Sequence, residues 1–247
     1  MNVFLYATKN ELHKLLLKKK YFVLTIIGAF VCFLRLGGDI LVAKLSEGQI
    51  TLKSNLVVSM LGFTVDILVP LIVFMAVTDL FTGEMQEDSF KASLLRPVSR
   101  FKVLLSKTVA AFVLGCIVTF LMFLVSAIMQ IISGRGFSNI PHSLAIYLVD
   151  MIPILGIAVL AVFINIISKS PTLSMLLCIA VYVLFKYINY YVSPIGQMIF
   201  TAYSQWHKIW LGTSLPFGAL MAKTGILFGS ILILYTLSYI MFDRKDC

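Results

Sequence analysis

The sequence has little charge. Only 13% of its 247 residues are Asp, Glu, Lys or Arg, whereas soluble domains carry about 25%. Hydrophobic residues make up 60%, and the mean hydropathy is +0.99. These figures exclude an ordinary soluble fold, a disordered chain and a collagen-like fibre, because each of these needs a more polar or strictly periodic sequence.

Cysteine and histidine are also scarce. Cys32, Cys116 and Cys178 lie within apolar runs and Cys247 is the last residue, so neither a disulfide framework nor a C-x-x-C metal pair is indicated. The three histidines lie in different segments, and no H-E-x-x-H motif or G-x-x-x-x-G-K-[ST] phosphate loop occurs. We therefore expect no metal, nucleotide or other cofactor bound by this chain, and an intramembrane enzyme is disfavoured.

What the sequence does contain is apolar blocks of about 20 residues, the length that crosses a hydrocarbon core of about 30 Å. They predict an all-α polytopic membrane protein with six transmembrane helices. These are expected at residues 21–42, 55–78, 103–132, 143–167, 172–191 and 224–242.

Basic residues outnumber acidic ones by 20 to 11. If the N-terminus is cytoplasmic, thirteen of the 20 flank the inner ends of the spans and seven the outer ends. Because cytoplasmic loops carry an excess of Lys and Arg, we predict a multi-pass protein of the cell (plasma) membrane with both termini in the cytoplasm. The net charge of +9 then reflects topology, and nucleic-acid binding is not expected because the charges are not gathered on one soluble face.

The first 20 residues predict an amphipathic elbow helix that lies in the membrane interface. The alternative is a solvated basic tail, which has no reason to keep helical periodicity. The apolar side of the helical wheel comprises Phe4, Leu5, Thr8, Leu12, Leu15 and Leu16, and the opposite side comprises Asn10, His13 and Lys14.

Proline and glycine mark several local features. Pro70 and Pro153 should kink spans two and four and free backbone carbonyls. Ser170-Pro171 predicts an N-cap and the first residue of span five, which leaves a very short inner turn after span four. Gly225-x-x-x-Gly229 in span six would allow another helix to approach closely, either within the chain or in a dimer.

Residues 192–223 follow span five on the outer side. They are largely apolar, but they are interrupted by Pro194, Gly196, Gly212 and Pro216, so we predict a re-entrant or interfacial segment rather than a seventh span. Tyr203, Trp206 and Trp210 would share one face of a short helix and anchor it at headgroup depth. A lid over a substrate exit is the alternative role.

Three ionisable residues lie inside the predicted spans, where charge is unfavourable and indicates a partner or a pathway. Asp66 falls near the midplane, and Asp150 and Lys186 fall at similar depths on sequential helices, which predicts an Asp150–Lys186 ion pair. A structural role is favoured over a proton or ion relay. Arg35 and Asp39, four residues apart, are predicted to pair near the outer end of span one.

The inner loop at residues 79–107 carries the most informative pattern. It predicts a short helix that ends before Pro97 and places Phe90 and Leu94 on one face, followed by a basic return to the membrane. Such a helix suits docking on a soluble partner. A merely solvated connector would not need an apolar pair at this spacing.

This loop resembles that of the ABC-2 class of ATP-binding-cassette transporter permeases. In that family an acidic residue that closes the second span is followed by Gly-Thr, a Leu-Leu pair, Pro-x-Ser-Arg and a downstream Lys. This chain departs at the Gly-Thr, where it has Asp88-Ser89. The resemblance extends over the whole chain, from the elbow helix to the segment before span six. The matching residues are Glu84, Leu94, Leu95, Pro97, Ser99, Arg100 and Lys107.

The resemblance implies a type V exporter-like fold and a permease that works with a separate ABC ATPase subunit. Two copies of that ATPase would bind ATP and Mg and push on the elbow helix and on the loop helix. A second permease chain, giving a homodimer, would complete the path through the lipid bilayer. The residues implied in coupling are Glu84, Glu87, Phe90, Leu94, Leu95, Pro97, Ser99 and Arg100, with Glu84 or Glu87 pairing with Arg100 to stiffen the loop.

The small outer loops disfavour a permease that handles a large hydrated polymer. Within the class, the chain resembles the compact permeases that export amphipathic peptides, such as phenol-soluble modulins or lantibiotics. Lipids or hydrophobic drugs are alternative substrates of the same class. A channel or ion-coupled carrier that uses Asp66, Asp150 and Lys186 is a competing class. It predicts inverted repeats between the halves, and none is evident.

Overall fold

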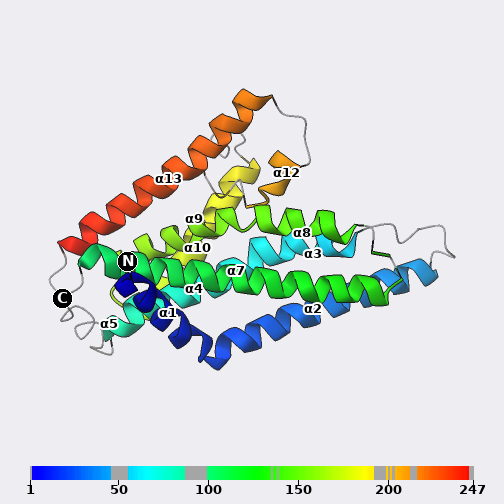
Figure 1. Ribbon diagram of the computed structural model, residues 1–247, viewed down its shortest axis with the longest axis horizontal. Coiled ribbons are helices and arrows are strands. Elements are labelled where there is room, and N and C mark those ends of the chain that lie inside the picture. The colour runs from blue at the N-terminus through cyan, green and yellow to red at the C-terminus, as the bar shows by residue number, and fades with distance from the viewer. Residues whose placement is uncertain are drawn as a thin grey trace.

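The computed structural model describes residues 2–45, 55–86, 99–134, 136–137, 139–191, 199, 201, 204–211 and 216–244. The secondary structure within these residues is helical throughout (Figure 1). The elements are α1 Asn2–Leu16, α2 Lys19–Leu45, α3 Leu56–Phe63, η1 Thr64–Leu68, α4 Val69–Thr78, η2 Asp79–Gly83, α5 Glu84–Gln86, α7 Arg100–Ile132, α8 Ile140–Val149, α9 Ile152–Ile167, α10 Pro171–Tyr191, α12 His207–Trp210 and α13 Phe217–Asp243.

Six helical stretches are long and apolar enough to cross a membrane, which confirms the predicted number of spans. Four boundaries differ from the prediction by three residues or more. The second span continues to Gln86, the third begins at Arg100, the fourth at Ile140 and the sixth at Phe217. Spans two and three therefore extend past their apolar blocks into the inner loop, because helical hydrogen bonding continues where the sequence turns polar.

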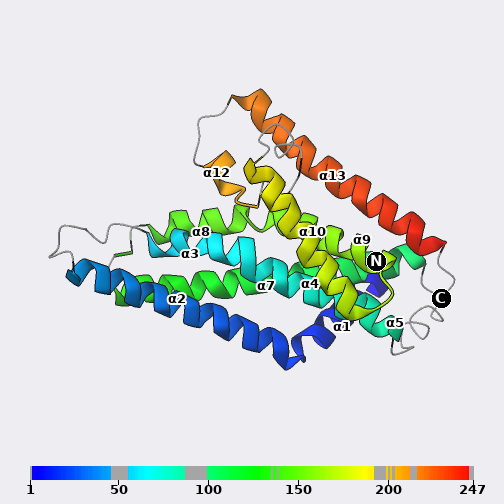
Figure 2. The ribbon, with the colours of Figure 1, turned by 180° about the vertical axis from the view of Figure 1, so that it is seen from behind.

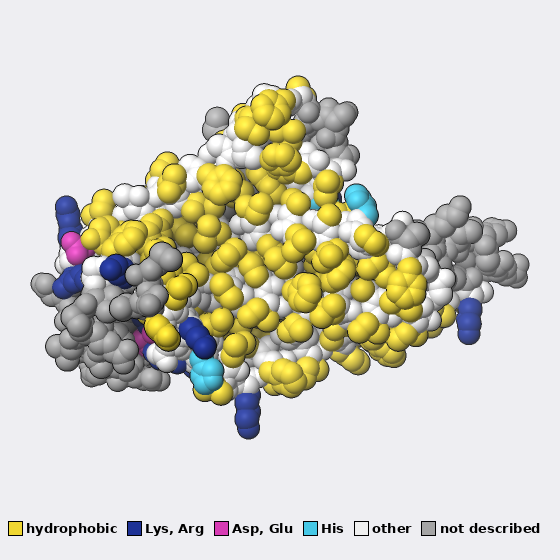
Figure 3. All heavy atoms as spheres, in the orientation of Figure 1, with side chains coloured by type: hydrophobic (Ala, Val, Ile, Leu, Met, Phe, Trp, Pro, Cys, Tyr) yellow, Lys and Arg dark blue, Asp and Glu magenta, His cyan; other side chains and the backbone are white. Residues whose placement is uncertain are grey.

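Helices α4, α7 and α9 form the centre of the bundle, and α2, α10 and α13 lie around it (Figures 1 and 2). Buried side chains such as Val73 of α4, Leu114 of α7 and Ala158 of α9 fill the space between the central helices. The peripheral helices keep large apolar side chains exposed, including Leu176 and Leu232. Figure 3 shows such side chains covering the middle of one face, as a surface in contact with lipid requires.

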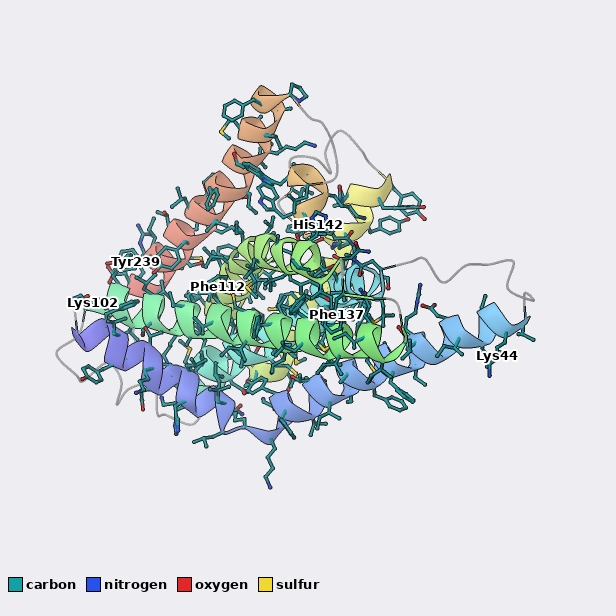
Figure 4. The ribbon with its side chains drawn as sticks, turned by 45° about the vertical axis from the view of Figure 1, so that its right-hand side comes forward. Lys44, Lys102, Phe112, Phe137, His142 and Tyr239 are labelled. Carbon is teal, nitrogen blue, oxygen red and sulfur yellow. The ribbon has the colours of Figure 1, made fainter. Side chains whose placement is uncertain are left out.

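The start of α1 and the end of α13 lie at one end of the bundle, as an even number of spans requires (Figure 1). This end also holds α5 and the start of α7, and it is called the inner end because the charge asymmetry of the sequence predicts that it faces the cytoplasm. Arg100 Nη1 donates a hydrogen bond to the Asp243 carbonyl oxygen at 2.7 Å. Figure 4 shows Lys102 and Tyr239 at this end and Lys44 at the far end of α2.

The disturbance predicted at Pro70 is found as a π-helical turn. Pro70 lacks the N–H that would donate to the Asp66 carbonyl four residues earlier, and the turn η1 occupies Thr64–Leu68 just before it. Tyr182 Oη of α10 donates to that carbonyl at 3.2 Å. The proline therefore leads to a contact between spans two and five at the depth of Asp66.

The kink predicted at Pro153 is a complete break in span four. Helix α8 ends at Val149 and α9 begins at Ile152, so Asp150 and Met151 lie between them. After α9, the predicted short turn leads to α10, where Ser170 Oγ accepts a hydrogen bond from Leu173 N–H at 3.3 Å and Pro171 is the first helical residue. This confirms the predicted N-cap.

Two glycines allow a comparison of close packing with open space. A Cβ atom on Gly115 of α7 would lie 2.7 Å from Ile154 Cγ2 and 3.0 Å from Val73 Cγ2. A Cβ atom on Gly225 of α13 would meet nothing within 4 Å among the described residues. Gly115 therefore lets α7 approach α9 and α4, whereas the Gly225-x-x-x-Gly229 stripe does not pack on any described part of this chain.

Gly115→Ala should accordingly lower the free energy of unfolding by about 1–3 kcal/mol, because the added methyl overpacks the core. Gly225→Ala is the matched control and should leave stability unchanged or raise it by up to about 1 kcal/mol, since alanine favours a helix. Thermal unfolding of the purified protein in detergent measures both. Equal shifts in the two variants would contradict the packing role of Gly115.

Candidate functional site

An ion-pair network, here called the inner network, joins the elbow helix to spans two and three. Lys107 Nζ of α7 lies 2.6 Å from Glu84 Oε2 and 3.4 Å from Glu11 Oε2. Lys14 Nζ lies 3.1 Å from Glu84 Oε1 and 3.2 Å from Glu11 Oε1. Two lysines and two glutamates thus neutralise one another at the inner end.

The burial of this network makes its pairing necessary. Lys107 is fully buried and Glu11 nearly so, whereas Lys14 keeps 43% of its side chain exposed. A charge removed from water needs a partner of opposite sign. Burial lowers the pKa of Lys14, but the Glu11 and Glu84 carboxylates outweigh it, so the pKa is raised and Lys14 stays charged.

The elbow helix packs on α7 along one flank. Leu15 is buried and Leu12 is partly buried, while Phe4 is half-buried and Leu16 is 52% exposed. Glu11 shares the buried flank, which the hydrophobic periodicity alone did not indicate. Half of the predicted apolar side therefore faces protein and the other half remains available to the membrane interface.

A second node forms at Asp79, at the start of η2. Its carboxylate lies 3.0 Å from Lys18 Nζ and 2.6 Å from Lys20 Nζ, and it accepts a hydrogen bond from the Tyr21 hydroxyl. A cavity of about 310 Å³ lies between this node and the inner network. The elbow, the start of span one and the end of span two are thus tied by charge at two points.

Several residues expected in coupling lie outside the described residues. These are Glu87, Phe90, Leu94, Leu95 and Pro97. Of the others, Ser99 is the N-cap residue of α7, whose carbonyl accepts from Lys102 N–H at 2.9 Å, and Arg100 donates to Asp243 at the end of α13.

Away from the inner end, Asp66 holds the chain that follows span five. Its Oδ1 accepts hydrogen bonds from Lys186 Nζ at 2.6 Å and Ser204 Oγ at 2.7 Å, and its Oδ2 accepts from Gln205 Nε2 at 2.7 Å. Lys186 Nζ also donates to Ser204 Oγ at 2.6 Å. The predicted Asp150–Lys186 pair is therefore wrong, because α10 packs against α4 and α9 and brings Lys186 to Asp66.

Asp150 binds a different residue of the same segment. It is fully buried at the break between α8 and α9. Its Oδ1 accepts the His207 backbone N–H at 2.6 Å, and its Oδ2 lies 2.6 Å from His207 Nδ1. Residues 204–207 are thus held by two carboxylates, one at the π turn of span two and one at the break in span four. We call this arrangement the outer clamp.

The two described aromatic residues of this segment share one face, as predicted, but differ in exposure. The ring centroids of Trp206 and Trp210 lie 6.5 Å apart. Trp206 is 2% exposed and belongs to the core cluster, whereas Trp210 is 41% exposed. Their anchoring at headgroup depth stays a prediction. Trp206 faces the core because its neighbours Gln205 and His207 are hydrogen-bonded to Asp66 and Asp150. Tyr203 lies outside the described residues. The predicted Arg35–Asp39 pair is confirmed at 3.4 Å.

The described part of the chain contains no group of three or more His, Cys, Asp or Glu side chains that could hold a metal ion. Its charged clusters pair acids with bases instead. Such pairs suit mechanical connection between helices rather than chemistry on a substrate.

A family model described as ABC-2 family transporter protein matches residues 7–186. The match runs from the elbow helix to the ion-paired Lys186 of α10 and covers most of the chain. The chain belongs to the ABC-2 transporter family. A comparison with curated proteins gives no match.

As a member of this family, the permease is a multi-pass transport subunit that implies an ATPase partner. The structure explains, in physical terms, why two of the motif residues have opposite charges. Glu84 and Lys107, on different spans, form the shortest contact of the inner network at 2.6 Å.

The permease offers a direct test of which intramembrane charges are paired. A double-mutant cycle of Asp66→Asn with Lys186→Met should give a coupling energy of about 1–3 kcal/mol, since the two charges are in contact. The cycle of Asp150→Asn with Lys186→Met should give less than about 0.5 kcal/mol. Both are measured by thermal or denaturant unfolding in detergent. Coupling in the second cycle alone would contradict the structure.

Proposed function

We propose that this chain is the permease of an ATP-driven exporter that moves an amphipathic or hydrophobic substrate, most simply an antimicrobial or toxin-like peptide, out of the cell. Two copies of a separate ATPase would supply the energy, and a second copy of the permease would form a homodimer with this one. The protein would lie in the cell membrane with both termini in the cytoplasm. The observation that carries the proposal is the inner network.

The inner network is suited to transmit force. Glu84 lies where span two enters the inner loop, and its partners lie on the elbow helix and on span three. A push on the loop or on the elbow would therefore move spans two and three together, because buried ion pairs resist separation. ATP binding and hydrolysis would bias two arrangements of this rigid unit, which is how a nucleotide drives a switch.

The outer clamp supports a closed outer end in the state described. It ties the chain between spans five and six to spans two and four. A cavity of about 170 Å³ beside it is lined by Asp66, Pro70, Phe74, Tyr182 and other mostly apolar residues. Its lining is apolar apart from Asp66, and its volume is below the range of about 300–1,000 Å³ typical of ligand sites, so a whole substrate needs a wider opening. Opening would require residues 204–207 to leave one or both carboxylates.

The test uses the permease co-expressed with its ATPase and reconstituted into liposomes. Phe90→Asp and Leu94→Asp should leave membrane insertion intact but uncouple ATP hydrolysis from transport, because an acidic group is unfavourable in an apolar docking face. Phe217→Asp, at the start of α13, is the matched control and should keep coupling.

One outcome would refute the docking role of the loop, and another would refute the proposed substrate. Unchanged coupling and unchanged ATPase co-purification in both loop variants would refute the docking role. ATPase activity stimulated by lipids or hydrophobic drugs but not by amphipathic peptides would keep the transporter class and replace the substrate.

A further inference from the structure

We propose that the permease binds an anionic phospholipid in a cavity at its inner end, between α4, α10 and the start of α2. The cavity has a volume of about 480 Å³, within the range of about 300–1,000 Å³ typical of ligand sites. Figure 2 shows α10 lying across α4 on the side where α1 and α5 are found. Nothing in the family assignment requires a lipid at this place.

The mouth of the cavity lies at headgroup depth. It is formed by Lys20, the second residue of α2, and by Pro171 and Thr172, the first residues of the 21-residue helix α10. Both helices cross the membrane from these residues onward. The N-terminus of α10 also directs its positive dipole end toward this mouth.

Lys20 and Asp79 both line the mouth, and their charges pair at 2.6 Å. Lys18, which lines the neighbouring cavity, lies 3.0 Å from the same carboxylate. Among the described residues this node therefore has two lysines for one carboxylate. Lys20 keeps 39% of its side chain exposed, and its ammonium group has three donors, so a proton remains available to a phosphate oxygen.

A buried hydroxyl points independently to a missing ligand. Thr78 lines the cavity and is only 5% exposed, yet its Oγ1 makes no hydrogen bond with the described residues. Other buried threonines of the bundle, such as Thr64 and Thr119, donate to the carbonyl four residues earlier in their own helix. A buried hydroxyl without a partner is unfavourable. Oγ1 itself is covered by protein atoms, so a rotation of the Thr78 side chain would bring it to an ester or phosphate oxygen in the cavity.

The rest of the cavity suits an acyl chain. Its wall is mostly apolar, with Met75 of α4 facing Met175 and Leu176 of α10. Leu176 is 61% exposed, so the wall continues into the lipid-facing surface of α10. A cationic mouth above an apolar wall that opens to the membrane matches a phospholipid with a negative headgroup better than a soluble anion or an uncharged drug.

The experiment is native mass spectrometry of the full-length permease in detergent, titrated with phosphatidylglycerol or phosphatidylcholine. Wild type should bind one phosphatidylglycerol more tightly than phosphatidylcholine. Lys20→Gln should weaken phosphatidylglycerol binding about fivefold, the effect of one lysine at an anionic surface. Lys44→Gln, the same change at the other end of α2, is the matched control and should have no effect.

Two further variants keep the test independent of the ion pair of Lys20 with Asp79. Thr78→Val should weaken phosphatidylglycerol binding while leaving lipid-free thermal stability equal to or above wild type, because it removes an unpaired buried hydroxyl. Met175→Trp should fill the cavity and abolish binding of both lipids.

The proposal is overturned by equal binding of the two lipids, by full phosphatidylglycerol binding in both Thr78→Val and Met175→Trp, or by inorganic phosphate competing as well as the lipid. It is also overturned if the variants change only the concentration dependence of dimerisation, which would identify a second copy of the chain as the occupant.

Discussion

Lys107→Met is expected to lower the free energy of unfolding by about 3–5 kcal/mol, since removal of one partner leaves a buried charge uncompensated. Lys107 is fully buried, and the variant would leave the carboxylates of Glu84 and Glu11 to share the charge of Lys14, so one negative charge of the inner network would lose its compensation. Thermal unfolding in detergent and the amount of folded protein in the membrane measure the loss. Any variant that survives should also show reduced coupling between ATP hydrolysis and transport.

Two controls separate this effect from the simple removal of a charge. Arg35→Met breaks the exposed Arg35–Asp39 pair, whose Arg side chain is 55% exposed, and should lower stability by less than about 1 kcal/mol. Adding Glu84→Gln to Lys107→Met should recover part of the loss, because one stranded charge is removed. A Lys107→Met loss no larger than that of Arg35→Met would show that the inner network does not stabilise the fold.

Asp150→Ala should destabilise the permease by about 3 kcal/mol, because it removes two hydrogen bonds and leaves buried donors of His207 unsatisfied. The local loss of stability should be largest at the outer clamp. Hydrogen exchange of residues 204–210 should accelerate far more than exchange in α7. In the proposed mechanism this variant should also raise ATPase activity without substrate, since the outer end is no longer held closed.

Ser204→Ala is the matched control for the clamp. Ser204 is one of several donors to Asp66, and Lys186 and Gln205 remain bound without it. Its loss should lower stability by about 1 kcal/mol, the contribution of a single hydrogen bond. If Asp150→Ala and Ser204→Ala accelerate exchange equally, Asp150 is not the main attachment of the segment.

The spans, the helix start at Ser170-Pro171 and the disturbances at the two prolines could be predicted from the sequence because they depend on short-range properties. Apolar length predicts a crossing helix, Ser170-Pro171 predicts a helix start, and Pro70 and Pro153 predict disturbed hydrogen bonding. Each of these features is present in the structure. The form of the disturbance was not predictable, because the missing N–H of a proline is accommodated by a π turn before Pro70 and by an interruption of the helix before Pro153.

The partners of the charged residues were not predictable in the same way. Glu84 and Lys107 were recognised as motif residues, but the contact of Lys107 with Glu11 joins positions 96 residues apart in the chain. Depth counted along straight helices placed Asp150 opposite Lys186. The π turn at Asp66, the break at Asp150 and the return of His207 into the bundle changed both pairings.

The sequence by itself determined that this protein has six segments long and apolar enough to span a membrane and which loop carries the family motif, and its charge asymmetry predicts the orientation of its ends. Hydropathy, charge asymmetry and helix propensity act over a few turns of chain, and a linear sequence contains all of them. Only the tertiary structure decided which acid meets which base. That choice depends on helix packing and on the high energy of an unpaired charge away from water, which selects partners in space regardless of their distance along the chain.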